Sequence, residues 1–339
     1  MNNIFVYCEI TEEGKIADVS LELLSKGRKL AAQLNVKLEA ILLGVNLEEA
    51  IKELSCFDIY KIHYADDPRL FPYRTLPHAK MIQAVFEKEK PEIALFGASS
   101  TGRDLAPRIA SALRCGLTAD CTSLEIGEYE DKKAGKTYKN LLYQIRPAFG
   151  GNIIATIINP DTRPQMATVR EGVMKLDPLT TQNTPLIQKI DFSLLTDVEE
   201  IVQIINRHID PPKVNLKGAQ IIVSGGYGMG SKENFEILYT LADVVGGEVG
   251  ATRAAVDAAF CGHERQIGQT GITVRPKLYI ACGISGSVQH RAGMDQSSKI
   301  ISINIDANAP VNAIADYTIV GDVMQIIPKI IQYYKKHSK

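Results

Sequence analysis

The chain has 339 residues, with 38 Lys and Arg against 39 Asp and Glu, so its formal net charge is −1. This balance gives no electrostatic support to nucleic-acid binding, and the longest apolar runs are too short to cross a bilayer. The N-terminus lacks the pattern of a secretory signal, so we expect a cytoplasmic protein. The six cysteines form no CxxC pair, which favours reduced thiols over a metal site.

The first region alternates predicted strands and helices. In chain order, we expect strand and helix pairs at 4–10 and 20–34, 37–44 and 47–54, 61–66 and 77–89, and 92–99 and 103–113. This alternation predicts a parallel sheet with helices on both faces. Further strands follow without helices between them and indicate an antiparallel extension, at 123–128, 141–146, 152–158 and 165–169.

A joint between two domains is predicted at 206–217, where Pro211 and Pro212 exclude a regular helix or a central strand. The segment just before it, 198–205, has the apolar spacing of a helix. A length of 339 residues also favours two domains. We therefore divide the chain into an N-terminal domain, a linker, a second domain and a C-terminal helix end and tail, at 1–205, 206–217, 218–328 and 329–339.

The second region alternates again, which predicts a smaller α/β domain. We expect its strands at 219–226, 277–283, 299–306 and 317–322. A helix is predicted at 232–245, and Asp322 is expected to cap a last helix at 324–334. In such sheets, ligands bind at the carboxyl ends of the strands, where the glycine-rich loops of this region lie.

Polar side chains and glycines alternate in the segments 250–257, 266–271 and 283–294. Such segments make a poor core and suit a backbone that approaches a large, phosphate-bearing ligand. The loop 283–290 would hold a pyrophosphate through backbone N–H groups and the hydroxyls of Ser285 and Ser287, or it is a bare glycine turn. Arg253, between small residues, would meet an anion or an aromatic ring, unless it is an ordinary surface arginine.

The loop 224–234 joins a strand to a helix and has two readings. One is a phosphate cradle at the helix N-terminus, and the other is a tight turn with Ser231 as N-cap. Its GGYGMG sequence has neither the G-x-G-x-x-G spacing nor a P-loop. In the first region, Thr101 and Asp104 in the loop 98–108 are expected to cap a helix, and a nucleotide site in this loop is the alternative. No catalytic triad, carboxylate pair or HExxH motif favours hydrolysis.

The segments SGGYGMGSKENFEILYTLAD, VGATRAAVDAAF and QIGQTGITVRPKLYIACGISGSVQHRAGM resemble the alpha subunit of electron transfer flavoproteins. The resemblance continues through FGASSTGRDLAPRIASALRCGLTADCTSLE and RPAFGGN in the first region. It implies an N-terminal domain similar to adenine nucleotide alpha hydrolases, which carries the beta-subunit interface. It also implies a Rossmann-like second domain that holds FAD, and a heterodimeric electron carrier that serves an acyl-CoA dehydrogenase.

By motif, the resemblance gives several residues a role toward FAD. Arg253 and Thr270 match residues beside the isoalloxazine ring, and His290 matches the residue that faces its O2 carbonyl. Thr252 matches a group on the pyrophosphate, whereas Asn304 and Asp322 match groups around the ribose and adenine. The full implied cofactor site is Gly228, Thr252, Arg253, Gln266, Gln269, Thr270, Gly283, Ser285, Gly286, Ser287, Gln289, His290, Asn304 and Asp322.

The segments RPAFGGN and RPQMATVREGVM resemble versions from anaerobic fermenters, some of which bifurcate electrons from NADH to ferredoxin or flavodoxin with a second FAD in the beta subunit. The resemblance leaves open whether this chain belongs to such an NADH-dependent acyl-CoA reductase complex. Two other classes also remain open, a nicotinamide-dependent dehydrogenase and a nucleotide-binding sensor module. The segment 261–264 departs from many relatives, which leaves the surface near the flavin edge undefined.

Overall fold

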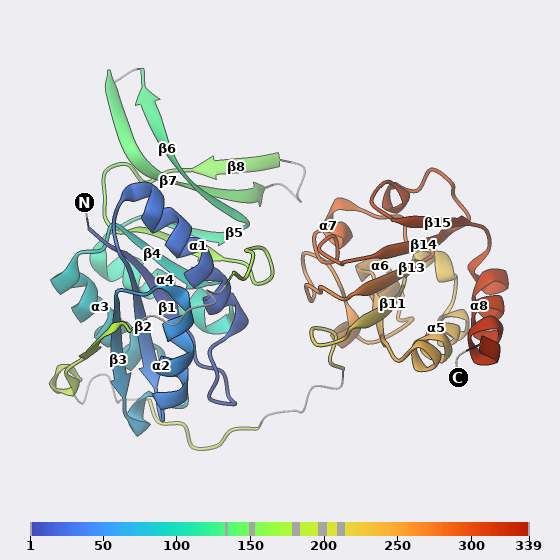
Figure 1. Ribbon diagram of the computed structural model, residues 1–339, viewed down its shortest axis with the longest axis horizontal. Helices are drawn as coiled ribbons and strands as arrows, with labels where there is room; N and C mark the ends of the chain where they lie inside the picture. The colour runs from blue at the N-terminus through green and yellow to red at the C-terminus, as the bar shows by residue number, and fades with distance from the viewer. Residues whose placement is uncertain are drawn as a thin grey trace. The chain divides into compact units, whose positions relative to one another are not determined.

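The computed structural model describes residues 2–132, 135–148, 153–177, 184–195, 202–208 and 214–337. Contacts divide the chain into two compact units, Met1–Arg207 and His208–Lys339. Each unit has its own parallel sheet covered by helices (Figure 1). The predicted α/β class with two parallel-sheet domains is therefore confirmed. Among the described residues, no helix has the length and apolar character needed to cross a membrane.

The first unit is built on a seven-stranded sheet with the order β10-β3-β2-β1-β4-β9-β5 and parallel pairing throughout. Its strands are β1 (Ile4–Cys8), β2 (Leu38–Gly44), β3 (Lys61–Asp66), β4 (Ile93–Gly97), β5 (Leu117–Cys121), β9 (Gln165–Val169) and β10 (Leu186–Lys189). Its helices are α1 (Asp18–Leu34), α2 (Glu48–Leu54), α3 (Thr75–Glu89) and α4 (Ser100–Leu113).

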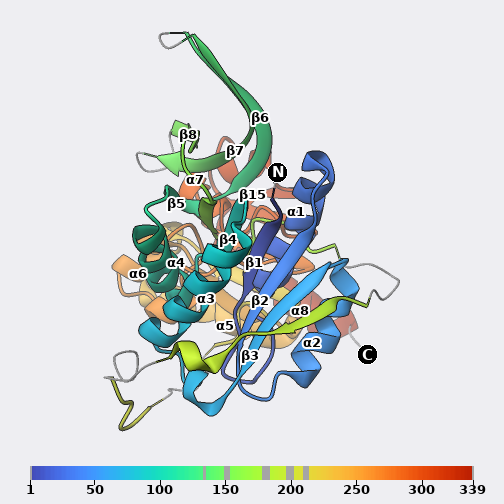
Figure 2. The same ribbon diagram turned by 90° about the vertical axis from the view of Figure 1, so that its left-hand side faces the viewer.

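Both faces of this sheet are buried because successive side chains of a strand point to opposite sides. In β1, Val6 packs into the core below α1 and α2, whereas Phe5 and Tyr7 pack into the core below α3 and α4. Figure 2 shows the two helix pairs on opposite sides of the sheet. This packing explains why the strands read as continuous apolar runs instead of alternating ones.

An antiparallel sheet extends from the first unit, with the order β6-β7-β8. Its strands are β6 (Ser123–Asp131), β7 (Lys136–Ala148) and β8 (Ile153–Ile157). The expectation that 165–169 joins this extension is wrong, because β9 pairs in parallel between β4 and β5. All five residues of β9 are buried, which suits a central position in a parallel sheet.

Two other expectations for the first unit are also wrong where the structure describes the residues concerned. The helix predicted from the apolar spacing at 198–205 lies partly outside the described residues, and 202–208 contain no helix. Ile205 is 98% exposed, and a short amphipathic segment that finds no surface to bury its apolar face gains little from becoming helical. The α4 N-cap is Ser99, whose hydroxyl accepts from Gly102 N, and not Thr101 or Asp104.

The second unit has a five-stranded parallel sheet with the order β12-β11-β13-β14-β15. Its strands are β11 (Ile221–Gly225), β12 (Glu248–Ala251), β13 (Leu278–Cys282), β14 (Ile300–Asn304) and β15 (Tyr317–Val320). Its helices are α5 (Lys232–Val245), α6 (Arg253–Asp257), α7 (Val288–Arg291) and α8 (Val323–His337). This order matches the flavodoxin-like form of the doubly wound fold. In that form the switch point lies between the first and the third strand of the sheet in chain order, which are β11 and β13 here.

Helices α5 and α8 pack on one face of the second sheet, where Phe235, Leu238 and Ile327 meet apolar strand residues. The other face carries a second core that includes Ile222, Tyr279 and Ile267. With both faces covered, the loops at the carboxyl ends of the strands are the part of this sheet left to form a site.

Candidate functional site

A cavity of about 440 Å³ opens at the carboxyl ends of β11 and β13, which is the switch point of the second sheet. Its volume lies within the usual range of small-molecule sites. Loops that follow β11, β12, β13 and β14 line it, together with the segment 267–270. The fold therefore brings together four loops that are far apart in the sequence, at the place where doubly wound folds bind their ligands.

Glycines allow the two loops of the switch point to touch. Gly226 N donates to Cys282 O at 2.9 Å, and Gly228 N donates to Gly283 O at 3.1 Å. A Cβ on Gly226 would lie only 2.2 Å from Gly283 O. These glycines are required for the contact between the loops. From the sequence, the glycines of this region were explained by the approach of the backbone to a ligand.

Twelve of the fourteen predicted site residues line this cavity, and Gln266 and Asp322 do not. Gln266 is buried and donates from Nε2 to Thr270 Oγ1 at 3.0 Å, so it supports a lining residue from behind. Asp322 Oδ1 accepts from Met324 N at 2.8 Å, which confirms that it caps the last helix. Ser231 caps α5 in the same way, accepting from Asn234 N at 3.2 Å.

Three hydroxyl oxygens in the cavity wall already accept hydrogen bonds from the protein. Thr270 Oγ1 accepts from Gln266 Nε2 at 3.0 Å. Thr252 Oγ1 accepts from Ala255 N at 3.4 Å, and Ser287 Oγ accepts from His290 N at 3.4 Å. A hydroxyl has a single proton to donate. Each of these side chains therefore keeps an O–H that it can donate to an acceptor-rich ligand.

The charge in the cavity wall comes from Arg253 and Asp306. Arg253 Nε lies 3.4 Å from Asp257 Oδ2, and its side chain is 68% exposed. An exposed pair of this kind is weak, so the guanidinium is available to an anion. Asp306 was missed by the sequence analysis, although an acidic residue two positions after a strand at this edge is a signal that could have found it.

Asn304 lies in the cavity wall but its amide is used within the protein. Its Nδ2 donates to Ile284 O at 2.8 Å, and its Oδ1 accepts from Asp306 N at 3.0 Å. The side chain therefore ties the loop after β14 to the loop after β13. Two other lining residues differ, because neither the Ser285 hydroxyl nor the Gln269 side-chain amide has a hydrogen-bond partner in the described part of the chain.

His290 is 4% exposed, and both of its ring nitrogens are bonded within the protein. Nδ1 lies 3.0 Å from Ile267 O, and Nε2 lies 3.0 Å from the hydroxyl of Tyr279. Burial lowers the pKa of His290 to about 4, although the bond to Ile267 raises it. In this conformation the ring has no free N–H for a ligand carbonyl, which differs from the role that the resemblance implies.

The fold and the cavity are those of doubly wound α/β proteins that bind nucleotide-type ligands at a switch point. Residues 4–195 match the electron transfer flavoprotein domain, and residues 215–295 match the electron transfer flavoprotein FAD-binding domain. The chain belongs to the electron transfer flavoproteins, as an alpha subunit. Such subunits pair with a beta subunit and act in electron transfer with dehydrogenases.

Three relatives illustrate the range of the family. The electron transfer flavoprotein subunit alpha of Thermoanaerobacterium thermosaccharolyticum is 46% identical, over 98% of each chain. The acryloyl-CoA reductase electron transfer subunit beta of Anaerotignum propionicum is 42% identical, over 98% of this chain and 96% of the relative. The LctC subunit of the NAD(+),ferredoxin lactate dehydrogenase of Acetobacterium woodii is 38% identical, over 94% of this chain and 74% of the relative.

Proposed function

We propose that the cavity of the second unit binds FAD. In this proposal the chain pairs with a beta subunit in the cytoplasm and passes electrons between a donor, either NADH or a dehydrogenase flavin, and an acyl-CoA dehydrogenase. The N-terminal domain at 1–205 would provide the beta-subunit interface, and the domain at 218–328 would hold the cofactor.

The observation that carries this proposal is the set of hydroxyls at Thr252, Thr270 and Ser287. Their oxygens already accept hydrogen bonds from protein N–H groups, so the remaining O–H groups can donate. Phosphate oxygens and ring carbonyls are acceptors, and Arg253 adds a positive charge. This donor set fits a dinucleotide with a polar ring and opposes a cationic or apolar ligand.

Bound FAD would supply the redox chemistry, and the chain's residues would hold and tune it. Ser285 and Ser287 would hold the pyrophosphate, together with Thr252. Gln269, Thr270 and Arg253 would contact the ring. His290 would close the wall behind the ring as a neutral group, and Asp306 would accept hydrogen bonds from ribose hydroxyls.

The test is the flavin content of the chain purified after co-expression with its beta subunit. We expect FAD in a fixed ratio to the heterodimer, with the yellow absorbance of a flavin. A double variant, Thr270→Val with Ser285→Ala, should lose much of the flavin, whereas Ser297→Ala, outside the cavity, should keep it. A colourless heterodimer would overturn the proposal in favour of a nucleotide-binding sensor module.

A second candidate is flavin-based electron bifurcation from NADH to ferredoxin or flavodoxin. It is favoured by the 38% identity to a subunit of an NAD(+),ferredoxin lactate dehydrogenase. Two FAD molecules per heterodimer, with rapid reduction by NADH, would support bifurcation. One FAD with AMP, and no reduction by NADH, would support simple transfer from a dehydrogenase.

A nicotinamide-dependent dehydrogenase is disfavoured by the state of His290. Such an enzyme needs an acid or base within reach of its substrate. Both ring nitrogens of His290 are committed to other groups of the protein, so this imidazole would have to break a bond before it could exchange a proton with a substrate.

A further inference from the structure

A second cavity lies at the carboxyl ends of the strands of the first unit. It has a volume of about 280 Å³ and is lined from the ends of β1 and β2, the segment after β3, and the first turns of α3 and α4. The order of the first sheet reverses between β1 and β4, so this edge is also a switch point, where doubly wound folds bind ligands. The proposed function gives this cavity no role.

Two buried side chains in the lining have polar groups without a partner. Tyr7 and His78 are both 3% exposed, and both line the cavity. Among the residues that the structure describes, neither the Tyr7 hydroxyl nor His78 Nε2 has a hydrogen-bond partner. Because buried polar groups are normally hydrogen-bonded, two open groups at one cavity indicate a polar ligand.

The open nitrogen of His78 is an acceptor. Nδ1 lies 3.0 Å from Arg74 O and must donate to it, because a carbonyl can only accept. Burial lowers the pKa of His78 to about 4, although the bond to Arg74 O raises it. The ring is therefore neutral near pH 7, and Nε2 presents a lone pair that can accept an N–H from a ligand.

The charge of the lining is negative. Glu9, Glu12 and Glu13 line the cavity, and no Lys or Arg does so among the described residues. Glu9 accepts from the Ser99 hydroxyl and keeps further acceptor sites, because a carboxylate can accept several hydrogen bonds. This excess of carboxylates opposes phosphate ligands and attracts cations. In the part of the chain described, no group of His, Cys, Asp and Glu could hold a metal ion, so the cation is expected to be organic.

A cation of the chain itself already contacts this lining. Arg207, in the segment before the second unit, pairs with Glu12, and its guanidinium lies 5.4 Å from the centre of the Phe71 ring. Glu12 and Phe71 both line the cavity. A carboxylate beside an aromatic face is an arrangement that stabilises a guanidinium or an ammonium. The lining is therefore suited to a cation with an apolar stem.

We propose that the cavity of the first unit binds a small organic cation of the primary-amine or guanidine class. Glu9 would carry the ion pair, His78 Nε2 would accept an N–H, and the rings of Phe71 and Tyr73 would pack against the alkyl part of the ligand. This site belongs to the first unit and does not rest on the proposed function.

The test is calorimetric titration of the heterodimer with agmatine, which carries a guanidinium and a primary ammonium on one alkyl chain. We expect one saturable site per heterodimer, with or without flavin in the second unit, and an affinity that falls as salt is added. Butanediol, a neutral chain of the same length, should not bind. Equal binding of butanediol, or no saturable binding of agmatine up to about 10 mM, would overturn the proposal.

A variant in the lining places the binding in this cavity. Glu9→Gln keeps an acceptor for the Ser99 hydroxyl but removes the charge, so it should weaken agmatine by about tenfold or more. Glu87→Gln, on the exposed face of α3 and outside the described lining, is the matched control and should leave the affinity unchanged. Equal affinities in Glu9→Gln and Glu87→Gln would contradict the proposal.

Two exposed positions provide a test that does not depend on the folding of Glu9→Gln. Arg207→Gln removes a positive charge beside the lining and should bind agmatine more tightly, by about twofold, since exposed charges act weakly. Glu13→Gln removes a negative charge from the lining and should bind it about twofold more weakly. Shifts in the same direction, or no shift in either variant, would reject the cavity as the binding site.

Discussion

Arg253 brings the positive charge to the cavity wall, and its effect on a bound flavin can be measured. A hydrogen bond from a charged group contributes about 1.5–3 kcal/mol, which corresponds to roughly 60–130 mV for one electron. The side chain is 68% exposed, so solvent screening favours the lower end. We predict that Arg253→Ala lowers the midpoint potential by about 60 mV, as measured by reductive titration.

Two control variants accompany this prediction. Arg253→Lys keeps the charge and should keep most of the potential. Arg291→Ala, on α7 but outside the cavity lining, should leave the potential unchanged. Equal potentials in Arg253→Ala and the unaltered protein would show that the guanidinium does not act on the ring.

We predict that the protein loses stability in acid, because two of its histidines are buried. Burial lowers the pKa of both His78, in the first unit, and His290, in the second unit, from 6.5 to about 4. In the unfolded chain these histidines therefore take up protons below about pH 6.5, whereas in the folded chain they do so only near pH 4. The free energy of unfolding is highest above pH 6.5, and between pH 7 and pH 5 it should fall by about 2 kcal/mol per histidine.

Urea unfolding at these two pH values tests this prediction. His78→Gln keeps a group that can donate to Arg74 O, the partner of Nδ1 at 3.0 Å, but it cannot titrate. The variant should therefore reduce the acid sensitivity of the first unit and leave that of the second unit unchanged. Equal sensitivity in both proteins would assign the acid effect to other groups.

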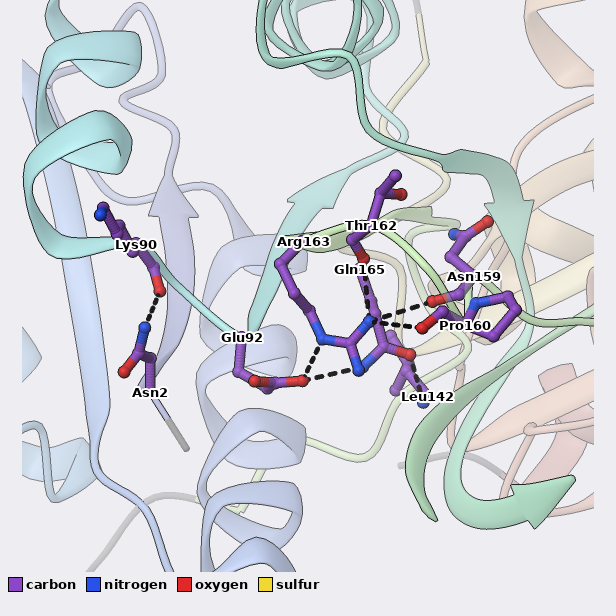
Figure 3. Close-up of polar contacts among 9 residues, drawn as sticks. All are labelled: Asn2, Lys90, Glu92, Leu142, Asn159, Pro160, Thr162, Arg163 and Gln165. Carbon is purple, nitrogen blue, oxygen red and sulfur yellow. Dashed lines mark hydrogen bonds and ion pairs between the residues drawn. The ribbon is translucent and has the colours of Figure 1, made fainter. Parts of the chain in front are cut away.

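At the scale of the elements, a polar cluster connects the antiparallel sheet to the parallel sheet of the first unit. Arg163 donates to Glu92, which precedes β4, and Nη1 donates to the carbonyls of Asn159, Pro160 and Thr162 at 3.2, 3.3 and 2.9 Å (Figure 3). Gln165, at the start of β9, accepts from Leu142 N in β7 at 2.8 Å.

We predict that Gln165→Leu destabilises the first unit by about 1–3 kcal/mol, because it leaves the buried Leu142 N–H without a partner. Gln83→Leu is the matched control, because the one side-chain partner of Gln83 among the described residues is Glu87, on the surface of α3. This variant should change the stability by less than about 0.5 kcal/mol. The measurement is the unfolding midpoint of the first unit. Equal midpoints for the two variants would refute the role of Gln165.

At the scale of the whole molecule, the segment before the second unit is attached to the first unit. Arg207 pairs with Glu12, and its guanidinium lies 5.4 Å from the centre of the Phe71 ring. Arg74 Nη1 donates to Val202 O at 2.9 Å. The residues 202–207 are therefore held by side chains of the first unit, although they form no regular structure.

Loss of this attachment should free the segment. We predict that Arg207→Gln speeds amide hydrogen exchange at 202–208, by a modest factor because exposed ion pairs are weak. Arg108→Gln, on the exposed side of α4, should have no such effect. Unchanged exchange in Arg207→Gln would show that Arg74 and the backbone are sufficient to hold the segment.

The sequence by itself determined the features that depend on local pattern. Apolar runs separated by amphipathic helices predict two parallel sheets, and the glycine-rich loops predict a ligand site at their carboxyl ends. The caps at Ser231 and Asp322 were also predictable, because a cap joins residues two or three positions apart. Only the tertiary structure decided that β9 pairs with β4 and β5, and that Ile267 O and the Tyr279 hydroxyl bond the ring of His290. The pattern of a segment reports its own burial, whereas a partner distant in sequence is chosen by how the whole unit packs.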